Sequence, residues 1–243
     1  MKNLFIALFL SLFIIACNSD DDDSEPSNTY YRLVKIENFK ANDSLDFTKT
    51  FVYDLNNRFS LLEINTDNVN SADEAINYIY DSNNTLIQYE RNYGTNIFYI
   101  CDYVYDGPLI SKIKLNTNVI AEYNYNSSEQ MVFMRAGSND CEFEYTYNNN
   151  GNVSIDKIDF CANQTYYMTY DDKKNPYELV YPEALYKIET MSINNTTRRY
   201  TSSSNNSWKE YEYNSKGYPI IYNYYYDGVL NKYQYYYYDT FYD

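Results

Sequence analysis

Apolar and polar residues alternate along most of this chain, and a short phrase recurs within the alternation. Its clearest copies are Tyr145–Val153 (YTYNNNGNV) and Tyr211–Pro219 (YEYNSKGYP). Two aromatic residues one position apart point to the same face of a strand. The following Asn can bond its own backbone two residues on, and the Gly tolerates the positive φ that closes a tight hairpin. The phrase therefore predicts the end of one strand, a reversal and the start of another.

The Asp or Asn of this phrase recurs at intervals along the chain. It falls at Asp54, Asp81, Asp106, Asn126, Asn148, Asp171 and Asn214. Neighbouring copies lie 20 to 27 residues apart, but the last two are 43 apart, so we expect a degenerate copy near Ile193-Asn194-Asn195. The pair Asp227-Gly228 is interpreted as the opposite end of the last hairpin. A period of about 22 residues accommodates two strands and two turns, which is typical of a repeat architecture.

These patterns predict an all-β domain over residues 30–243, an up-and-down antiparallel meander of about 14 to 16 strands. We expect either an open curved sheet or a porin-like barrel. Tyr occurs 34 times and favours strands, while Asn supplies most turns because Gly occurs only 6 times. Residues 71–76 predict a short helical turn or a long hairpin loop, and residues 201–207 a polar loop. Pro176 and Pro182 interrupt the strand pattern and suit loops or edges.

The N-terminus predicts export. Residues 1–16 are almost wholly apolar after Lys2 and form a signal peptide that is too short to span a bilayer. They end Ile14-Ile15-Ala16-Cys17, which resembles a bacterial lipobox, and this resemblance implies that Cys17 is acylated and becomes the first mature residue. Residues 17–29 are acidic and polar and predict a disordered tether.

The recurring phrase resembles the tyrosine-aspartate (YD, Rhs-type) repeat, whose usual form is Tyr-x-Tyr-Asp-x-x-Gly-Arg-Leu. Only the copies at Asn148 and Asn214 keep Gly in place, and none has the Gly-Arg pair. With its N-terminus, the chain resembles Bacteroidetes cell-surface lipoproteins of unknown function. The resemblance implies a porin-like antiparallel sheet, palmitate on Cys17 and a surface-exposed place on the outer membrane. The outward face lacks a clean apolar band, so we do not expect a barrel that inserts in the bilayer.

Charge and residue types exclude several functions. The formal net charge is −15, which argues against nucleic acid as a partner because phosphate contacts need a basic footprint. The chain has no His, and therefore lacks Ser-His-Asp and Cys-His machinery and the commonest transition-metal ligand. We expect no cofactor, no metal site and no enzymatic activity. A glycosidase with paired carboxylates stays open as a less favoured alternative.

Cysteines and aromatic residues supply the remaining candidates. A disulfide between Cys141 and Cys161 is plausible because both lie near the far end of one predicted hairpin, although Cys101 allows other pairings. Stacked aromatic residues of the C-terminal hairpins could bind the apolar faces of sugar rings. The candidate ligand-binding residues are Trp208, Tyr224, Tyr226, Tyr236 and Tyr238.

The predicted function is a non-catalytic surface lipoprotein that binds a glycan or another extracellular ligand, including a protein partner. The alternative is a structural or adhesive repeat protein, in which tyrosine pairs only stabilise the sheet.

Overall fold

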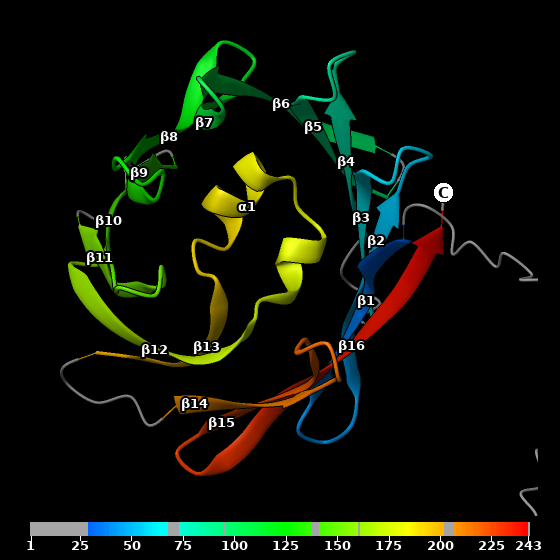
Figure 1. The fold of residues 1–243 in the computed structure, drawn as a ribbon, viewed down its shortest axis with the longest axis vertical. Coiled ribbons are helices and arrows are strands. Elements are labelled where there is room, and N and C mark those ends of the chain that lie inside the picture. The colour runs from blue at the N-terminus through cyan, green and yellow to red at the C-terminus, as the bar shows by residue number, and fades with distance from the viewer. Residues whose placement is uncertain are drawn as a thin grey trace, which may run out of the picture.

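The computed structural model describes residues 29–67, 73–94, 96–137, 141–159, 161–201 and 207–242, and these form one sixteen-stranded antiparallel sheet with two short helices (Figure 1). This confirms the predicted all-β meander. The strands are β1 (Thr29–Lys40), β2 (Leu45–Tyr53), β3 (Phe59–Thr66), β4 (Glu74–Tyr80), β5 (Leu86–Tyr93), β6 (Asn96–Asp106), β7 (Leu109–Leu115), β8 (Asn118–Tyr125), β9 (Met131–Ala136), β10 (Cys141–Tyr147), β11 (Val153–Asp159), β12 (Gln164–Lys174), β13 (Asn194–Tyr200), β14 (Ser207–Tyr213), β15 (Pro219–Tyr226) and β16 (Val229–Tyr242).

The sheet curls into a nearly closed barrel (Figure 1). Each strand pairs with its neighbours in sequence except at β13 and β14, and β1 also pairs with β16, so that Thr29 lies opposite Tyr242. The two ends of the sheet are therefore β13 and β14. These strands lie side by side without a backbone ladder among the described residues, and we call the line between them the seam.

The repeated turns all lie at one end of the barrel, which we call the turn end. In five of them the side-chain Oδ1 of the leading Asp or Asn accepts from the backbone N–H groups two and four residues on, at 2.8–3.1 Å. The leading residues are Asp54, Asp81, Asn126, Asn148 and Asn214. The residue three positions later has positive φ: Asn57, Asn84, Glu129, Gly151 and Gly217. The turn chemistry predicted from the phrase is thus present.

In five copies of the phrase, and at Tyr238 before Asp239, a tyrosine has a common role at the same end, whereas Tyr170 and Tyr213 bond side chains instead. The tyrosine hydroxyl donates to a backbone carbonyl near the start of the preceding strand, where no turn joins the two strands. The pairs are Tyr53 to Leu33, Tyr80 to Phe59, Tyr105 to Leu86, Tyr125 to Ile110, Tyr147 to Met131 and Tyr238 to Pro219, at 2.6–2.8 Å. Turns and tyrosine hydroxyls therefore alternate around the rim and link its strands.

The expected degenerate turn near Ile193-Asn194-Asn195 is wrong. Asn194 begins β13, and Asp171 lies within β12 instead of leading a turn. The long interval arises because residues 175–193 leave the sheet and form two helices, η1 (Pro176–Leu179) and α1 (Glu183–Glu189). The two prolines start these helices, where proline at the first turn costs no hydrogen bond.

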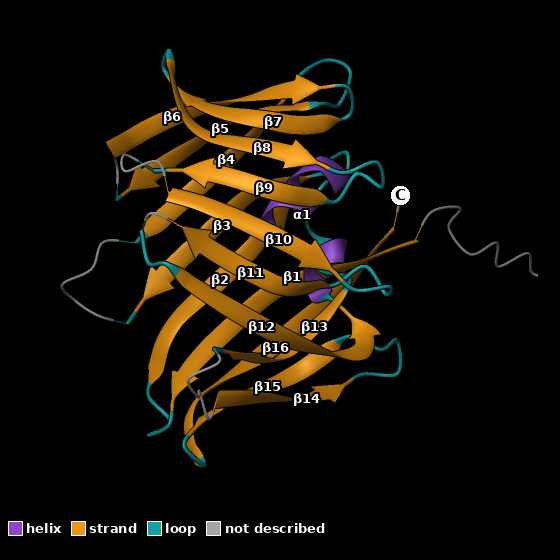
Figure 2. Cartoon of the chain, turned by 90° about the vertical axis from the view of Figure 1, so that its left-hand side faces the viewer, coloured by secondary structure: helices purple, strands orange, loops and turns teal. Residues whose placement is uncertain are grey.

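The two helices occupy the lumen toward the turn end (Figures 1 and 2). We call residues 175–193, which include both helices, the plug. Leu185 and Ile188 pack with Tyr103, Tyr123 and Met131 in one buried cluster. Val180 joins a second cluster formed by Leu33, Ile36, Phe51, Phe59 and Leu62. The lumen at this end is therefore a packed core.

The opposite end, which we call the far end, carries the Asp227-Gly228 reversal between β15 and β16, as predicted. It also carries a disulfide between Cys141 and Cys161, whose Cα atoms are 5.4 Å apart, while Cys101 is free and buried. Residues 1–28, including Cys17, lie outside the described residues, as do residues 71–72 and 202–206 of the two expected loops. Both expected loops are shorter than predicted, because Glu74 begins β4 and Ser207 begins β14.

Candidate ligand-binding cleft

The predicted ligand-binding aromatics do not form one platform. Tyr236 and Tyr238 face the lumen: Tyr236 donates to Gln234 at 2.9 Å, and Tyr238 makes the turn-end bond to Pro219. Trp208 stacks on Tyr225 with ring centroids 5.1 Å apart. Tyr226 is 51% exposed at the far end of β15. Two of the five, Trp208 and Tyr224, line a common cavity, which is the main candidate site.

This cavity lies at the seam toward the far end, and we call it the seam cleft. Its volume is about 490 Å³, within the range of roughly 300–1,000 Å³ that is typical of small-molecule sites. It is lined by Tyr166, Arg198, Arg199, Ser207, Trp208, Lys209, Tyr222, Tyr224, Asn231 and Lys232. Because successive strand residues face opposite sides of the sheet, Trp208 and Arg198 point outward while Lys209 and Arg199 point into the lumen. The cleft thus includes side chains from both faces of the wall.

The seam is held mainly by side chains. Ser207 donates to the carbonyl of Arg199 at 3.5 Å, and the Tyr211 hydroxyl donates to the carbonyl of Thr196 at 3.0 Å. Farther along, the Tyr213 hydroxyl donates to Asp171 of β12. The cleft lies beside the Ser207 bond, in the far-end part of the seam.

Each lumen-facing cation of the cleft lies against an aromatic ring. The guanidinium of Arg199 is 3.8 Å from the ring centroid of Tyr166, while Lys209 lies 5.6 Å from Tyr222 and Lys232 lies 5.6 Å from Tyr224. Such contacts stabilise a cation that has lost part of its water.

The cleft is electropositive within an acidic protein. Among the residues that the structure describes, four of the lining side chains are cations and none is a carboxylate. Arg199 is neutralised by Asp156 at 2.7 Å, and burial raises the pKa of that carboxyl despite the guanidinium. Lys209 is different: burial, with Lys232 and Arg199 nearby, lowers its pKa to about 8. An anion placed beside Lys209 would relieve this repulsion.

The lumen between the plug and the far end also carries charged groups. Glu189, the last residue of α1, has a solvent-accessible side chain that the walls of the barrel surround. Desolvation by the surrounding protein raises the pKa of Glu189, and the charge of Lys49 opposes that shift. Glu74 and Arg91 form an ion pair of 2.5 Å, and Arg91 donates to the Tyr99 hydroxyl at 2.7 Å.

A second cavity of about 360 Å³ lies at the turn end between α1 and two of the turns. Tyr147, Met131 and Met191 provide much of its wall. Its cation, Lys187, is paired with Glu129 at 2.5 Å and Glu183 at 3.1 Å. Since this charge is satisfied inside the protein, the cavity offers less to an ionic ligand than the seam cleft does.

Sequence reasoning identified Trp208 and Tyr224 but missed Arg199, Lys209 and Lys232. These cations come from three different strands, and only Arg199 has a cationic neighbour in sequence, Arg198, so no local motif marks the cluster. A lysine at a lumen-facing position among tyrosines was the available signal, because a charge on an inward face needs a partner or a function.

No group of three or more His, Cys, Asp or Glu side chains that could hold a metal ion occurs within the described part of the chain. In the same part, no helix is long and apolar enough to cross a membrane.

Comparison with known proteins identifies the fold. No protein-family model matches the sequence, and no curated protein matches it either. Among solved structures, the chain is similar to a porin-like protein from Bacteroides uniformis ATCC 8492, determined at 2.32 Å. The TM-score is 0.55 with 11% sequence identity, over 85% of this chain and 98% of that chain. The predicted porin-like sheet is thereby confirmed as a fold, and at this identity the likeness extends to the fold alone.

Proposed function

We propose that this chain is a non-catalytic, lipid-anchored protein of the outer-membrane surface that binds a glycan in the seam cleft. The observation that carries the proposal is the cleft itself, where Trp208 and Tyr224 offer aromatic surface beside Lys209 and Lys232. Aromatic rings suit the apolar faces of sugars, and polar side chains beside them suit hydroxyl and acid groups.

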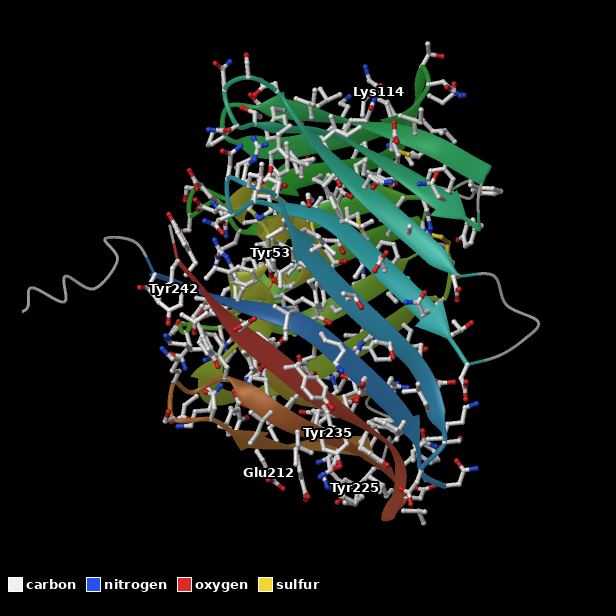
Figure 3. All side chains as sticks on the ribbon, turned by 90° about the vertical axis from the view of Figure 1, so that its right-hand side faces the viewer. Tyr53, Lys114, Glu212, Tyr225, Tyr235 and Tyr242 are labelled. Carbon is white, nitrogen blue, oxygen red and sulfur yellow. A yellow bond between two sulfur atoms is a disulfide. The ribbon has the colours of Figure 1, made fainter. Side chains whose placement is uncertain are left out.

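The outer wall supports a barrel that stands in water. A ladder of cross-strand ion pairs runs around β7 to β10: Lys112 to Glu122 at 3.0 Å, Glu122 to Arg135 at 3.6 Å and Arg135 to Glu142 at 2.8 Å. Lys114 lies on the same strand as Lys112 (Figure 3). Charges on a lipid-facing strand each cost about 2–4 kcal/mol at mid-membrane, so this face fits a protein that a lipid at Cys17 anchors.

The position of the first strand supports the orientation. Thr29 begins β1 at the turn end, beside the end of β16 (Figure 2). A lipid on Cys17 would therefore be joined to the barrel at its turn end and leave the seam cleft at the opposite end.

A structural or adhesive role is the second candidate, and the turn-end tyrosines favour it. Their hydroxyls bond backbone carbonyls within the sheet, so these tyrosines are explained without any ligand. The third candidate, a carbohydrate-active enzyme, draws no support from the cleft, whose described lining lacks a carboxylate.

Affinity electrophoresis tests the binding proposal. The full chain, in mild nonionic detergent, is run through gels that contain neutral or acidic polysaccharides. We expect at least one polysaccharide to retard it and Trp208→Ala to reduce the retardation. The thermal unfolding of this variant, followed by circular dichroism, should be unchanged, which would show that the variant is folded. Migration unaffected by every polysaccharide would favour the structural role.

Metabolic labelling tests the anchor. In a bacterium that acylates lipoproteins, an alkyne analogue of palmitate should label the chain and fail to label Cys17→Ser. Equal labelling of both would disprove acylation at Cys17.

A further inference from the structure

We propose that the seam cleft selects acidic oligosaccharides, and that Lys209 and Lys232 bind the carboxylate of a uronic acid unit. This inference rests on the proposed glycan-binding function and specifies its ligand.

The cleft differs in charge from the chain as a whole. The chain has a formal net charge of −15, yet the described lining of the cleft carries cations and no carboxylate. Lining cations come from β13, β14 and β16, so three strands bring like charges together. Like charges repel one another, so a cluster of cations is unfavourable in the free protein. An anionic ligand would offset this repulsion.

The cations of the cleft differ in their partners. Arg199 donates to Asp156 at 2.7 Å and stacks on Tyr166, so its charge is largely neutralised within the protein. Lys209 and Lys232 instead lie against the rings of Tyr222 and Tyr224. A ring face attracts an ammonium group but leaves its N–H donors available to an acid group.

The ligand must also approach the protein around the cleft. Apart from the lining cations the chain has a net negative charge, and exposed charges act over about 8 Å at physiological salt. An oligosaccharide with one carboxylate per sugar can place a single acid in the cleft and keep neutral hydroxyls outside it. Densely charged polymers such as sulfated polysaccharide or single-stranded DNA would meet repulsion beyond the cleft. The geometry therefore favours uronic acid units over heavily sulfated or phosphate-rich chains.

The test uses Trp208, the only tryptophan of the chain, which lies in the lining of the cleft. Tryptophan emission of the full chain in detergent is titrated with oligomers of galacturonate, glucuronate and mannuronate, and with their methyl esters, which have the same rings without the charge. We expect a saturable change with at least one acidic oligomer and binding at least about tenfold weaker with its ester, since the ester lacks the charge-assisted hydrogen bonds to the lysines.

Matched variants locate the effect. Lys209→Met with Lys232→Met should weaken binding of the acid by about tenfold or more and leave binding of the ester unchanged. Lys112→Met with Lys114→Met removes the same charge from the outer wall and should have no such effect. Lys209→Arg should retain most of the binding, and melting curves of each variant confirm that it is folded.

The outcomes separate the inference from the proposed function. If ester and acid bind equally, glycan binding stands and selection of the acid is wrong. If the acid binds but the cleft variant and the wall variant behave alike, the assignment to Lys209 and Lys232 is wrong. If dextran sulfate or single-stranded DNA binds more tightly than any uronate, the ligand class is wrong. If no polysaccharide or oligomer binds, the proposed function itself fails.

Discussion

The two ends of the barrel are built on different principles. At the turn end, one short phrase is repeated, and each copy supplies a turn through Asp or Asn and a cross-strand bond through Tyr. At the far end, strands are joined by connections of varied length, one disulfide is present, and the seam opens into the cleft. Repetition therefore accounts for stability at one end, and departures from it account for the candidate site at the other.

The comparison shows that one residue type serves two purposes. Tyr125 and Tyr147 use their hydroxyls to tie neighbouring strands, and burial raises the pKa of both. Tyr222 and Tyr224 instead place their ring faces against Lys209 and Lys232. Abundance of tyrosine alone thus does not indicate a binding surface; the partner of each tyrosine does.

The largest difference between the ends should appear when a ring is removed from each. Phe59 is 2% exposed and lies 4.6 Å from Tyr78 and 5.5 Å from Tyr181 of the plug, measured between ring centroids. Phe59→Ala should lower the free energy of unfolding by about 3–5 kcal/mol, because it removes a packed ring and leaves a cavity.

The matched change at the far end is Phe98→Ala, since Phe98 is 68% exposed. It should cost less than about 1 kcal/mol. Urea denaturation followed by circular dichroism measures both values. Similar losses for the two variants would show that the far end contributes as much to stability as the turn end does.

At the cleft, removing a charged side chain should stabilise the fold instead of weakening it. Burial and the charges of Lys232 and Arg199 lower the pKa of Lys209 to about 8, whereas an unfolded lysine titrates near 10.4. Asp156, the neighbouring carboxylate, is engaged by Arg199. Lys209→Met should therefore raise the free energy of unfolding at pH 7 by about 1–2 kcal/mol, even though it weakens ligand binding.

The lowered pKa of Lys209 also makes the stability of the fold depend on pH. Between about pH 8 and pH 10 the unfolded chain holds this proton and the folded chain has released it, so native stability should rise with pH across that window. Lys209→Met should lack this part of the rise. Denaturation at pH 7 and pH 9.5 measures it, with Lys112→Met as the control; a less stable Lys209→Met would mean that Lys209 supports the fold.

The smallest effect concerns a single hydroxyl. Tyr125→Phe removes the donor to the carbonyl of Ile110, a bond of 2.6 Å, and should cost about 1 kcal/mol. The same change at exposed Tyr226 should cost less than about 0.5 kcal/mol. Equal thermal midpoints for the two variants would contradict a stabilising role for the repeated hydroxyl.

The local features of the fold could be predicted because they are written in adjacent residues. The turn at Asn214 needs only Asn214 and Gly217, so sequence reasoning found it, and repetition of the pattern predicted the meander. The plug was missed because its period of three to four residues, at Leu185 and Ile188, is confined to one short helix. Its start signal, Pro182 followed by Glu183, was interpreted only as an interruption.

The candidate site was less predictable because it depends on distant residues. Tyr166, Arg199, Lys209 and Lys232 meet only after the sheet curls and leaves its seam between β13 and β14. No spacing in the sequence indicates where a nearly closed barrel will have its gap. The aromatic content directed attention to Trp208 and Tyr224, and the charged half of the cleft required the structure.

Hydrogen exchange with and without a bound acidic oligosaccharide reports on both ends of the barrel in one measurement. We expect slower exchange on binding in the far-end portions of β13, β14, β15 and β16, with no change in the turns led by Asp54, Asp81 and Asn148. Slower exchange at those turns or in the plug, with the seam unaffected, would contradict the division of the molecule into a structural end and a binding end.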